Sequence, residues 1–332
     1  MRSAVERGAS GVAIDFATAS FSDALAIARE AAQSGAPRAV VTLPNEGDAF
    51  LDGVADAISL AERASVAVHV ANHHVMYPGS SGRMERSLEA IDRARTRGAA
   101  VTIDIAPYVA TWTTLASLLP APLTPSMLDD DTIAAGAALQ LQARLGEHWS
   151  DFVLAEVSSE ERMEWCGMRI DEIARQTWRS PARTVIELIR DEGERARVFW
   201  FCLREDDVAT ALSADFCAIG TAAASYAISD RPYGLVHPRA FGSFPRVFGR
   251  FVRQRRALTL TEAVRRMTSL PASIFGLHDA GRLEVDAPAD VVVFDEDLFA
   301  DTATYERPFS LPIGLHRVFR RGVELALPGG PA

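Results

Sequence analysis

Lysine is missing from this sequence, and all 34 basic residues are arginines. Its absence excludes a Schiff-base lysine, the phosphate-binding lysine of a P-loop and a lysine-derived carbamate as a metal ligand. The codon bias of a GC-rich genome explains such a composition without any functional reason. The chemistry of this chain must therefore come from histidine, arginine, tyrosine and the acidic residues.

Cysteine is scarce, and positive charge is not in excess. Cys166, Cys202 and Cys217 lack CxxC or CxxxC spacing, which argues against a disulfide framework or a zinc knuckle. The net charge of -10 argues against nucleic acid and anionic membrane surfaces as partners. Charged residues or glycine interrupt the longer apolar runs, and residues 1–7 lack the apolar core of a signal peptide. We therefore expect a cytoplasmic protein that binds neither nucleic acid nor membrane.

The sequence does contain a regular alternation of strand and helix patterns. Strands are predicted near residues 11–15, 39–43, 66–70, 100–105, 197–203 and 216–219. Helices are predicted near residues 22–32, 48–64, 84–96, 170–176, 182–191, 205–213 and 261–267. Such alternation is typical of an α/β fold, here with six strands in one parallel sheet. From about Gly281 the pattern changes to short β segments and turns, which predicts a small separate β unit.

Two strands carry polar side chains on one face. In the segment 66–73 the valines alternate with Ala67, His69, Ala71 and His73, which would share the opposite face. In the segment 101–105, Thr102 and Asp104 would likewise share one face. If the sheet is part of a barrel, the valines meet the outer helices and the polar residues point inward. His73 would then lie near the carboxyl ends of the strands, where barrel enzymes place their active sites.

The last predicted strand ends in Gly220-Thr221-Ala222-Ala223-Ala224, which cannot ionise. The loop that follows is rich in side chains that line functional sites: His237, Arg239, Ser243, Arg246 and Arg250. The strand end thus has no ionisable group, although the loop that follows it is rich in polar side chains.

Four stretches identify a family resemblance. They are "NHHVMYPGSSGRMERSLEAIDRARTRGAAVTIDIAPYVATWTTLASLLP", "HPRAFGSFPRVFGRFVR", "LTLTEAVRRMTSLPASIFGL" and "ADVVVFDEDLFADTATYERP". In this order they resemble the N-acyl-D-amino-acid deacylase (D-aminoacylase) family of the amidohydrolase superfamily. The resemblance implies a TIM-type (β/α)8 barrel beside a small β-sandwich, and a relationship to zinc-dependent hydrolysis of N-acylated D-amino acids. It implies that residues 1–280 form an incomplete barrel, about strands three to eight, and residues 281–332 the C-terminal half of the small β domain.

The resemblance carries over few of the family's catalytic residues. The sequence has no HxH motif, and the chain is expected to begin after the strands that bear HxH and a cysteine ligand. His73 matches the histidine after the fifth strand, whereas Thr102 and Ala222 replace the sixth-strand histidine and the eighth-strand aspartate. His73 and Asp104 are thus the candidate metal ligands, and zinc is expected to be absent or weakly bound. No catalytic residue can be assigned, because alanine cannot carry a proton; Asp230 is a substitute that no motif supports.

The candidate substrate-binding residues are Tyr108, His237, Arg239 and Arg246. Each also has a structural interpretation. The two arginines bind a substrate carboxylate, or they attach the long loop to acidic neighbours. Tyr108 reaches the pocket or packs at a strand end, and His237 serves the site or only the fold. His69 is interpreted as a core histidine, and the arginine-rich run 250–256 as a solvated face.

Two functions are compatible with this pattern. The first is a degenerate member, a pseudoenzyme that acts as a partner or regulatory subunit and is inactive in isolation. The second is an active amidohydrolase, possibly a split enzyme completed by a polypeptide that carries the HxH and cysteine ligands. In both cases an incomplete barrel exposes strand edges, so a homo- or hetero-oligomer is expected to cover them. The expected ligand is a small acylated amino acid.

Overall fold

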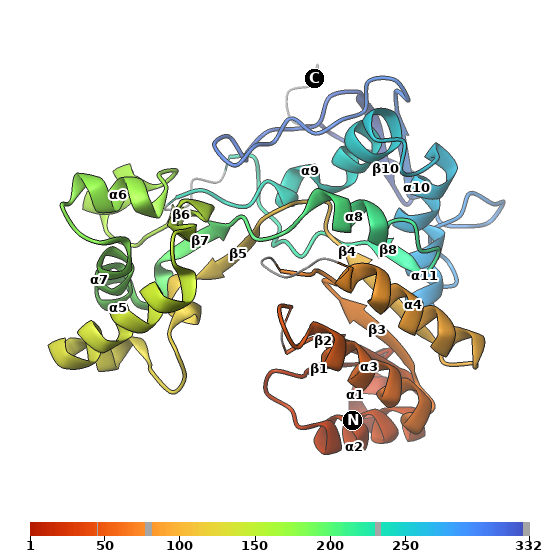
Figure 1. Cartoon of the computed structure of the whole chain (residues 1–332). Coiled ribbons are helices and arrows are strands. Elements are labelled where there is room, and N and C mark those ends of the chain that lie inside the picture. Colours follow the sequence, from red (N-terminus) through yellow and green to blue (C-terminus); the bar gives the residue numbers. More distant parts are fainter. Residues whose placement is uncertain (45, 77–81, 230–233, 328–332) are drawn as a thin grey trace.

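The centre of the molecule is a five-stranded parallel sheet (Figure 1). The computed structural model describes residues 1–44, 46–76, 82–229 and 234–327. The strand order is β1-β2-β3-β4-β8, and the sheet does not close into a barrel. Its strands are β1 (Val12–Asp15), β2 (Arg38–Thr42), β3 (Ala67–Ala71), β4 (Val101–Ile105) and β8 (Cys217–Ile219).

Amphipathic helices cover one face of this sheet. They are α2 (Phe21–Gln33), α3 (Phe50–Ala64), α4 (Arg83–Thr96) and α8 (Glu205–Ala211), and the short α1 (Arg2–Glu6) precedes β1. Ser20 begins α2 as an N-cap, because its hydroxyl accepts a hydrogen bond from the backbone N–H of Asp23. Val68 and Val70 of β3 are fully buried in the core that these helices share with the sheet. This arrangement confirms the expected outward direction of the valines.

The other face of the sheet is the inner face of the barrel-type arrangement, and it is more polar. The strand register places His69 beside Thr102, and Arg38 beside Ala67. Along β4, the half-buried Thr102 and Asp104 point to this inner face. Val101, Ile103 and Ile105 alternate with them and are buried on the other face. The prediction for the faces of β4 is therefore confirmed.

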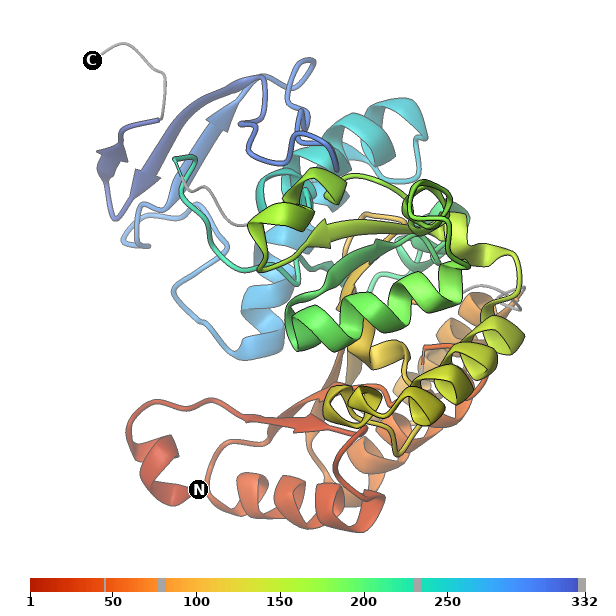
Figure 2. The ribbon, with the colours of Figure 1, turned by 90° about the vertical axis from the view of Figure 1, so that its left-hand side faces the viewer.

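A second unit is inserted between β4 and β8. Its sheet is antiparallel, in the order β5-β7-β6, and in Figure 2 it faces the viewer with α5 and α7 beside it. The strands are β5 (Thr111–Thr114), β6 (Phe152–Glu156) and β7 (Arg197–Trp200). The α-helices of this unit are α5 (Asp131–Leu145), α6 (Ile170–Gln176) and α7 (Pro181–Glu192). Its short 3-10 helices are η1 (Leu115–Leu118), η2 (Pro125–Asp129), η3 (His148–Asp151), η4 (Glu160–Trp165) and η5 (Gly193–Arg195). The unit has a separate hydrophobic core.

This insertion corrects one prediction. The strand expected at 197–203 was assigned to the parallel sheet, but it pairs antiparallel with β5 and β6 instead. Val198 and Phe199 are both fully buried, so the strand has the continuous apolar pattern typical of a parallel core strand. Such a pattern reports burial on both faces and does not specify the direction of the neighbouring strands.

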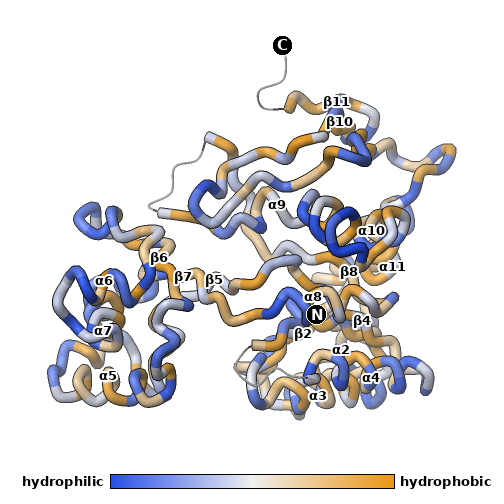
Figure 3. Tube along the Cα trace, turned by 45° about the horizontal axis from the view of Figure 1, so that its top comes forward, coloured by the Kyte–Doolittle hydropathy of each residue, from blue (hydrophilic) through white to orange (hydrophobic). Residues whose placement is uncertain are grey.

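The last part of the chain forms helices and then the small β unit. Its helices are α9 (Arg239–Arg246), the π-helix η6 (Val247–Gln254), α10 (Leu260–Met267) and α11 (Ser269–Phe275). Of these, α9 reaches the carboxyl end of β4, and α11 reaches the amino ends of β2 and β3. The strands β9 (Val291–Phe294), β10 (Leu315–Arg320) and β11 (Val323–Leu325) form an antiparallel sheet in the order β11-β10-β9. None of the residues in these three strands is buried, and Figure 3 shows hydrophobic stretches at this sheet.

The expected α/β class, the incomplete barrel-type sheet and the small C-terminal β unit are all present. The division into 1–280 and 281–332 stays a prediction. Among the helices of the described residues, none combines the length and apolar character needed to cross a bilayer.

Candidate functional site

A histidine–aspartate pair lies on the inner face of the parallel sheet. Nε2 of His69 is 2.9 Å from Oδ2 of Asp104, and Nδ1 of His69 is 2.9 Å from the hydroxyl of Thr102. The backbone N–H of Asn72 donates to Oδ1 of Asp104 at 3.0 Å. Both carboxylate oxygens thus have partners within the chain. A Cβ atom at Gly220 would lie 2.5 Å from Oδ1 of Asp104, so the pair also requires a glycine at the end of β8.

His73, the other candidate metal ligand, points to the opposite side of the sheet. Its Nε2 lies 2.9 Å from the hydroxyl of Ser87 on α4, and its ring centroid lies 4.9 Å from that of Phe50 on α3. The expectation that His69 and His73 share a face is therefore wrong. The physical reason is Asn72, whose φ of 54° ends the extended backbone and breaks the two-residue alternation.

The environment of His73 fixes its protonation state. Ser87 donates its own hydroxyl hydrogen to the carbonyl of Met84, so Nε2 of His73 is the donor to Ser87. Burial first, and then the neighbouring His74, lower the pKa of His73 to about 3. Nδ1 is thus an unprotonated acceptor, and it has no hydrogen-bond partner among the described residues. This ring is a neutral core group between the sheet and two helices.

His237 is part of an aromatic cluster beyond the carboxyl ends of the strands. Its Nε2 donates to the carbonyl of Ala110 at 3.0 Å, and its Nδ1 accepts from the backbone N–H of Arg239 at 3.1 Å. Its ring meets the rings of Tyr108 and Tyr305 edge-on, with centroids 5.1 Å apart in both cases. Burial first, and then Arg239, lower the pKa of His237 to about 3. Because both ring nitrogens are engaged, His237 holds the wall of the site in place.

Three buried donors around His237 are unused. They are Nε of Arg239 and the hydroxyls of Tyr108 and Tyr305, and each is without a hydrogen-bond partner in the described parts of the chain. Burial raises the pKa of both tyrosines, so their hydroxyls keep their protons. Buried donors of this kind are costly unless an acceptor satisfies them. The cluster is therefore suited to bind an acceptor group such as a carboxylate.

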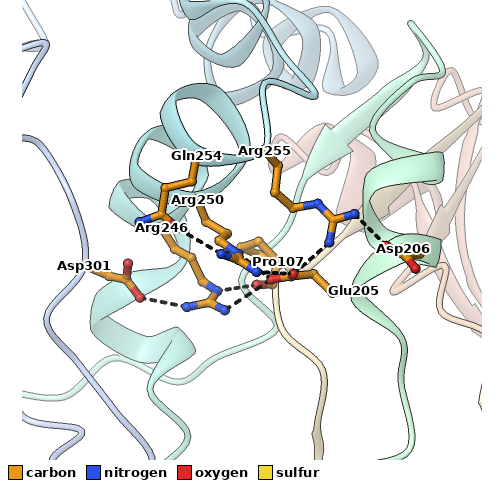
Figure 4. A network of polar contacts seen from close by, with 8 residues as sticks. All are labelled: Pro107, Glu205, Asp206, Arg246, Arg250, Gln254, Arg255 and Asp301. Carbon is orange, nitrogen blue, oxygen red and sulfur yellow. Dashed lines mark hydrogen bonds and ion pairs between the residues drawn. The ribbon is translucent and has the colours of Figure 1, made fainter.

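Arg246, the other predicted carboxylate-binding residue, is fully engaged. Its Nε donates to the carbonyl of Pro107 at 2.7 Å, and its Nη1 donates to Asp301 at 3.2 Å (Figure 4). Its Nη2 lies 3.8 Å from Glu205, and its guanidinium stacks over the ring of Tyr108 at 4.9 Å. Of its two interpretations, these contacts favour the attachment of the loop to acidic neighbours.

Glu205 is the centre of this network, a role that was not predicted from the sequence. Arg250 and Arg255 both donate to its carboxylate, and Arg255 also reaches Asp206 (Figure 4). The hydrogen bond from Arg250 is the largest cause that lowers the pKa of Glu205 to about 2. The arginine-rich run, interpreted as a solvated face, is exposed at residues 254–256, but its Arg250 and Arg255 also pair with Glu205. The four-residue spacing of Arg246 and Arg250 was the available signal, because it puts both on one face of a helix.

A second missed residue is Glu46, which follows the carboxyl end of β2. It is half-buried, and its carbonyl accepts a hydrogen bond from the backbone N–H of Met76 at 2.7 Å. Burial raises the pKa of Glu46 to about 7, against an opposing effect of Arg239. A carboxyl group that titrates near neutrality is a common feature of functional sites. Its position after a strand end was the only signal in the sequence.

The strand end that lacks an ionisable group is that of β8. Ala222 follows β8, is exposed and has a left-handed φ of 47°. Asp230, the suggested substitute acid, lies outside the described residues. The proton-handling role that the resemblance assigns to this position therefore has no side chain at 222 to perform it.

Comparisons with known proteins place this geometry in a family. The model of the amidohydrolase family matches residues 126–307. An N-acyl-D-glutamate deacylase of Alcaligenes xylosoxydans xylosoxydans is 33% identical over 296 residues, which are 89% of this chain and 52% of the relative. A D-aminoacylase of the same organism is 29% identical over 285 residues, 84% of this chain and 49% of the relative. The chain thus spans about half the length of these curated relatives.

A solved structure gives the same result. The N-acyl-D-glutamate deacylase of Bordetella bronchiseptica, a complex with zinc and a phosphonate inhibitor, aligns with a TM-score of 0.80 and 30% identity. The alignment covers 100% of this chain and 62% of that one. A D-aminoacylase structure aligns with a TM-score of 0.75 and 26% identity over 97% of this chain and 60% of that one. The chain belongs to the amidohydrolase family.

The zinc that this family implies does not fit the described residues. A catalytic zinc takes about three nitrogen, sulfur or oxygen ligands from the protein. No three His, Cys, Asp or Glu side chains come together as such a set in the described parts of the chain. His73 faces the helices, and both oxygens of Asp104 already accept hydrogen bonds. The described side chains therefore do not form the ligand set of a catalytic zinc.

Proposed function

We propose that this chain is a degenerate amidohydrolase that binds a small acylated amino acid without hydrolysing it, and that it acts as a partner or regulatory subunit. The observation that carries the proposal is the separation of His73 and Asp104 onto opposite faces of the sheet. Two ligands of one metal ion must lie within a few ångströms of each other. Side chains that point away from each other across a sheet cannot meet this condition.

The binding part of the proposal is supported by the cluster around Arg239. Arg239 is a half-buried cation with a buried, unpartnered Nε in the described parts of the chain, and the hydroxyls of Tyr108 and Tyr305 are two neutral donors. A carboxylate is the acceptor that suits such donors, because it offers two oxygens with several lone pairs. The curated relatives are named for N-acyl-D-glutamate and D-amino acids, which carry such a carboxylate. We therefore infer that the ligand is an N-acylated D-amino acid.

The partner part of the proposal is supported by unpaired strands and exposed apolar side chains. β1 and β8 are edge strands of the parallel sheet, and among the described strands each pairs with a single neighbour. In the C-terminal sheet, Val292 is 53% exposed and Val323 is 66% exposed. Strand edges and exposed valines of this kind favour association with another polypeptide. We propose a homo- or hetero-oligomer that covers these surfaces.

Isothermal titration calorimetry with N-acetyl-D-glutamate tests the binding part. The purified chain should bind the ligand, and chromatography should recover it with its amide intact. Arg239→Met should weaken the affinity by about tenfold or more, because a charge-assisted hydrogen bond is lost. The control Arg175→Met removes an exposed arginine that is paired with Asp171, and it should leave the affinity unchanged. Release of glutamate by the wild-type chain would overturn the proposal.

Light scattering after gel filtration tests the partner part. The account predicts an oligomer, or a poorly ordered monomer that gains thermal stability when a partner is added. A single sharp monomeric species with a high melting temperature contradicts it.

The second candidate is an active enzyme, possibly split between two polypeptides. It is favoured by Glu46, whose carboxyl group carries a proton near neutral pH and lies within electrostatic reach of Arg239. Under this hypothesis a second chain supplies the HxH and cysteine ligands, and Glu46 moves the proton that Ala222 cannot. Co-expression with such a polypeptide should then produce hydrolysis that Glu46→Gln abolishes. If Glu46→Gln leaves the hydrolysis intact, Glu46 has no such role.

A further inference from the structure

A cavity of about 300 Å³ lies at the amino-terminal end of the parallel sheet, on its inner face. The strands contribute residues from the start of β2, β3 and β4, and α11 contributes the opposite wall. This is the end of the sheet away from Tyr108 and Arg239, so the cavity is separate from the site described above. Its volume is at the lower limit of pockets that bind small molecules.

The local sequence explains why space is left here. Ala67 and Ala100 have small side chains where the strands begin, so the inner face is hollow at this level. α11 is held against the strands by two contacts. Nε of Arg38 donates to the carbonyl of Ile274 at 3.0 Å, and the ring of Phe275 meets that of His69 edge-on at 5.5 Å. The helix therefore closes one side of the cavity without filling it.

Two arginines line the cavity without a carboxylate partner. Arg38 uses Nε for the carbonyl of Ile274, and Arg95 uses Nη1 for the carbonyl of Val101 at 2.8 Å. Among the residues that the structure describes, no acidic side chain lies within ion-pair distance of either guanidinium. Arg250 and Arg255 differ from these two arginines, because both pair with the carboxylate of Glu205. Two cations on one recess attract an anion, and the remaining N–H groups offer it hydrogen bonds.

The rest of the lining indicates what kind of anion fits. The side chains of Leu270, Ile274 and Phe275 are apolar, and Ser273 offers a hydroxyl. We propose that this cavity binds a small organic carboxylate with an apolar body, such as one aromatic ring or a short chain. The carboxylate is bound by Arg38 and Arg95, and the apolar body lies against α11. The inference does not depend on the proposed function, because it uses none of the residues around Arg239.

Calorimetry with benzoate, and with benzyl alcohol as its neutral counterpart, tests this inference. Benzoate should bind the wild-type chain, and benzyl alcohol should bind at least about tenfold more weakly, because it cannot pair with the arginines. Inorganic phosphate should also bind more weakly than benzoate, because it has no apolar body. Equal binding of benzoate and benzyl alcohol, or no binding of benzoate, would overturn the inference.

Variants then locate the bound anion. Arg95→Gln and Arg38→Gln should each weaken benzoate binding by about tenfold or more. Ser273→Trp keeps every charge and should abolish benzoate binding, because the larger side chain fills the cavity. This variant tests the location of the bound anion even if Arg38→Gln does not fold. Arg93→Gln is the matched control, because this exposed arginine on the same helix pairs with Glu89 outside the cavity.

Arg239→Met separates this inference from the proposed function. Benzoate affinity should not change in this variant, whereas N-acetyl-D-glutamate affinity should fall. If Arg239→Met and not Arg95→Gln removes benzoate binding, the anion occupies the other site and this inference is wrong.

Discussion

The guanidinium of Arg250 binds the carboxylate of Glu205 through two hydrogen bonds, from Nε to Oε1 at 2.8 Å and from Nη2 to Oε2 at 2.6 Å. This pair joins the π-helix η6 to the start of α8, and Arg246 and Arg255 approach the same carboxylate. Glu205 is thus the acid that three arginines of this segment share, and Arg246 also bonds to Pro107 and Asp301 (Figure 4). Positive charge in the loop serves mainly to hold the loop.

The first prediction concerns Glu205. Glu205→Ala leaves three arginines without their shared partner, and it should lower the free energy of unfolding by about 2–3 kcal/mol. Urea denaturation followed by circular dichroism measures this change. The control Asp206→Ala removes a neighbouring, largely exposed carboxylate of the same network and should cost less than about 1 kcal/mol. Equal losses in the two variants would show that Glu205 is not the centre of the network.

The second prediction concerns the pH dependence of stability. Burial raises the pKa of Glu46 to about 7 in the folded chain, from an ordinary value of 4.5. The contribution of this group is favourable below pH 4.5 and is lost as the pH rises through about 7, because ionisation is costly in the folded state. Glu46→Gln should therefore be close to the wild type at pH 4.5 and more stable by about 3 kcal/mol at pH 8, at about 1.4 kcal/mol for each unit of the pKa shift.

Chemical denaturation at both pH values measures the effect of Glu46→Gln. Asp48→Asn is the control, because it removes a nearby carboxylate that is exposed. A wild-type chain that equals Glu46→Gln in stability at pH 8 would contradict a raised pKa for Glu46.

The third prediction concerns the pair of His69 and Asp104. Asp104→Ala removes the acceptor for His69 and for the backbone N–H of Asn72, and it should lower the free energy of unfolding by about 2–3 kcal/mol. The exposed Asp131→Ala should cost less than about 1 kcal/mol, although it too breaks an ion pair. If Asp104→Ala is tolerated as well as Asp131→Ala, the pair contributes nothing to the fold.

The regular elements could be predicted from the sequence because periodicity reports burial directly. The helices at 21–33, 50–64 and 83–96 begin and end close to the predicted residues. The polar face of β4 followed from simple alternation. The pairing partners of β7 could not be predicted in this way. A buried strand has the same apolar pattern whether its neighbours run parallel or antiparallel to it.

The site was harder to predict because its chemistry depends on contacts between distant segments. One left-handed residue, Asn72, turned His73 away from the inner face, and no periodicity signals such a residue in advance. The role of Glu205 depended on arginines that follow it by 41 to 50 residues, from Arg246 to Arg255. The raised pKa of Glu46 depended on its burial in the folded chain, which the residues around it in the sequence do not indicate.

The central claim is that the side chains of this chain do not assemble a hydrolytic metal centre by themselves. Elemental analysis of the purified chain after incubation with zinc and removal of excess metal tests this claim most directly. The account predicts far less than one zinc per chain, and a melting temperature that chelators do not change. Near-stoichiometric zinc that a chelator removes with a fall in melting temperature, together with cleavage of N-acetyl-D-glutamate by the same preparation, would contradict it.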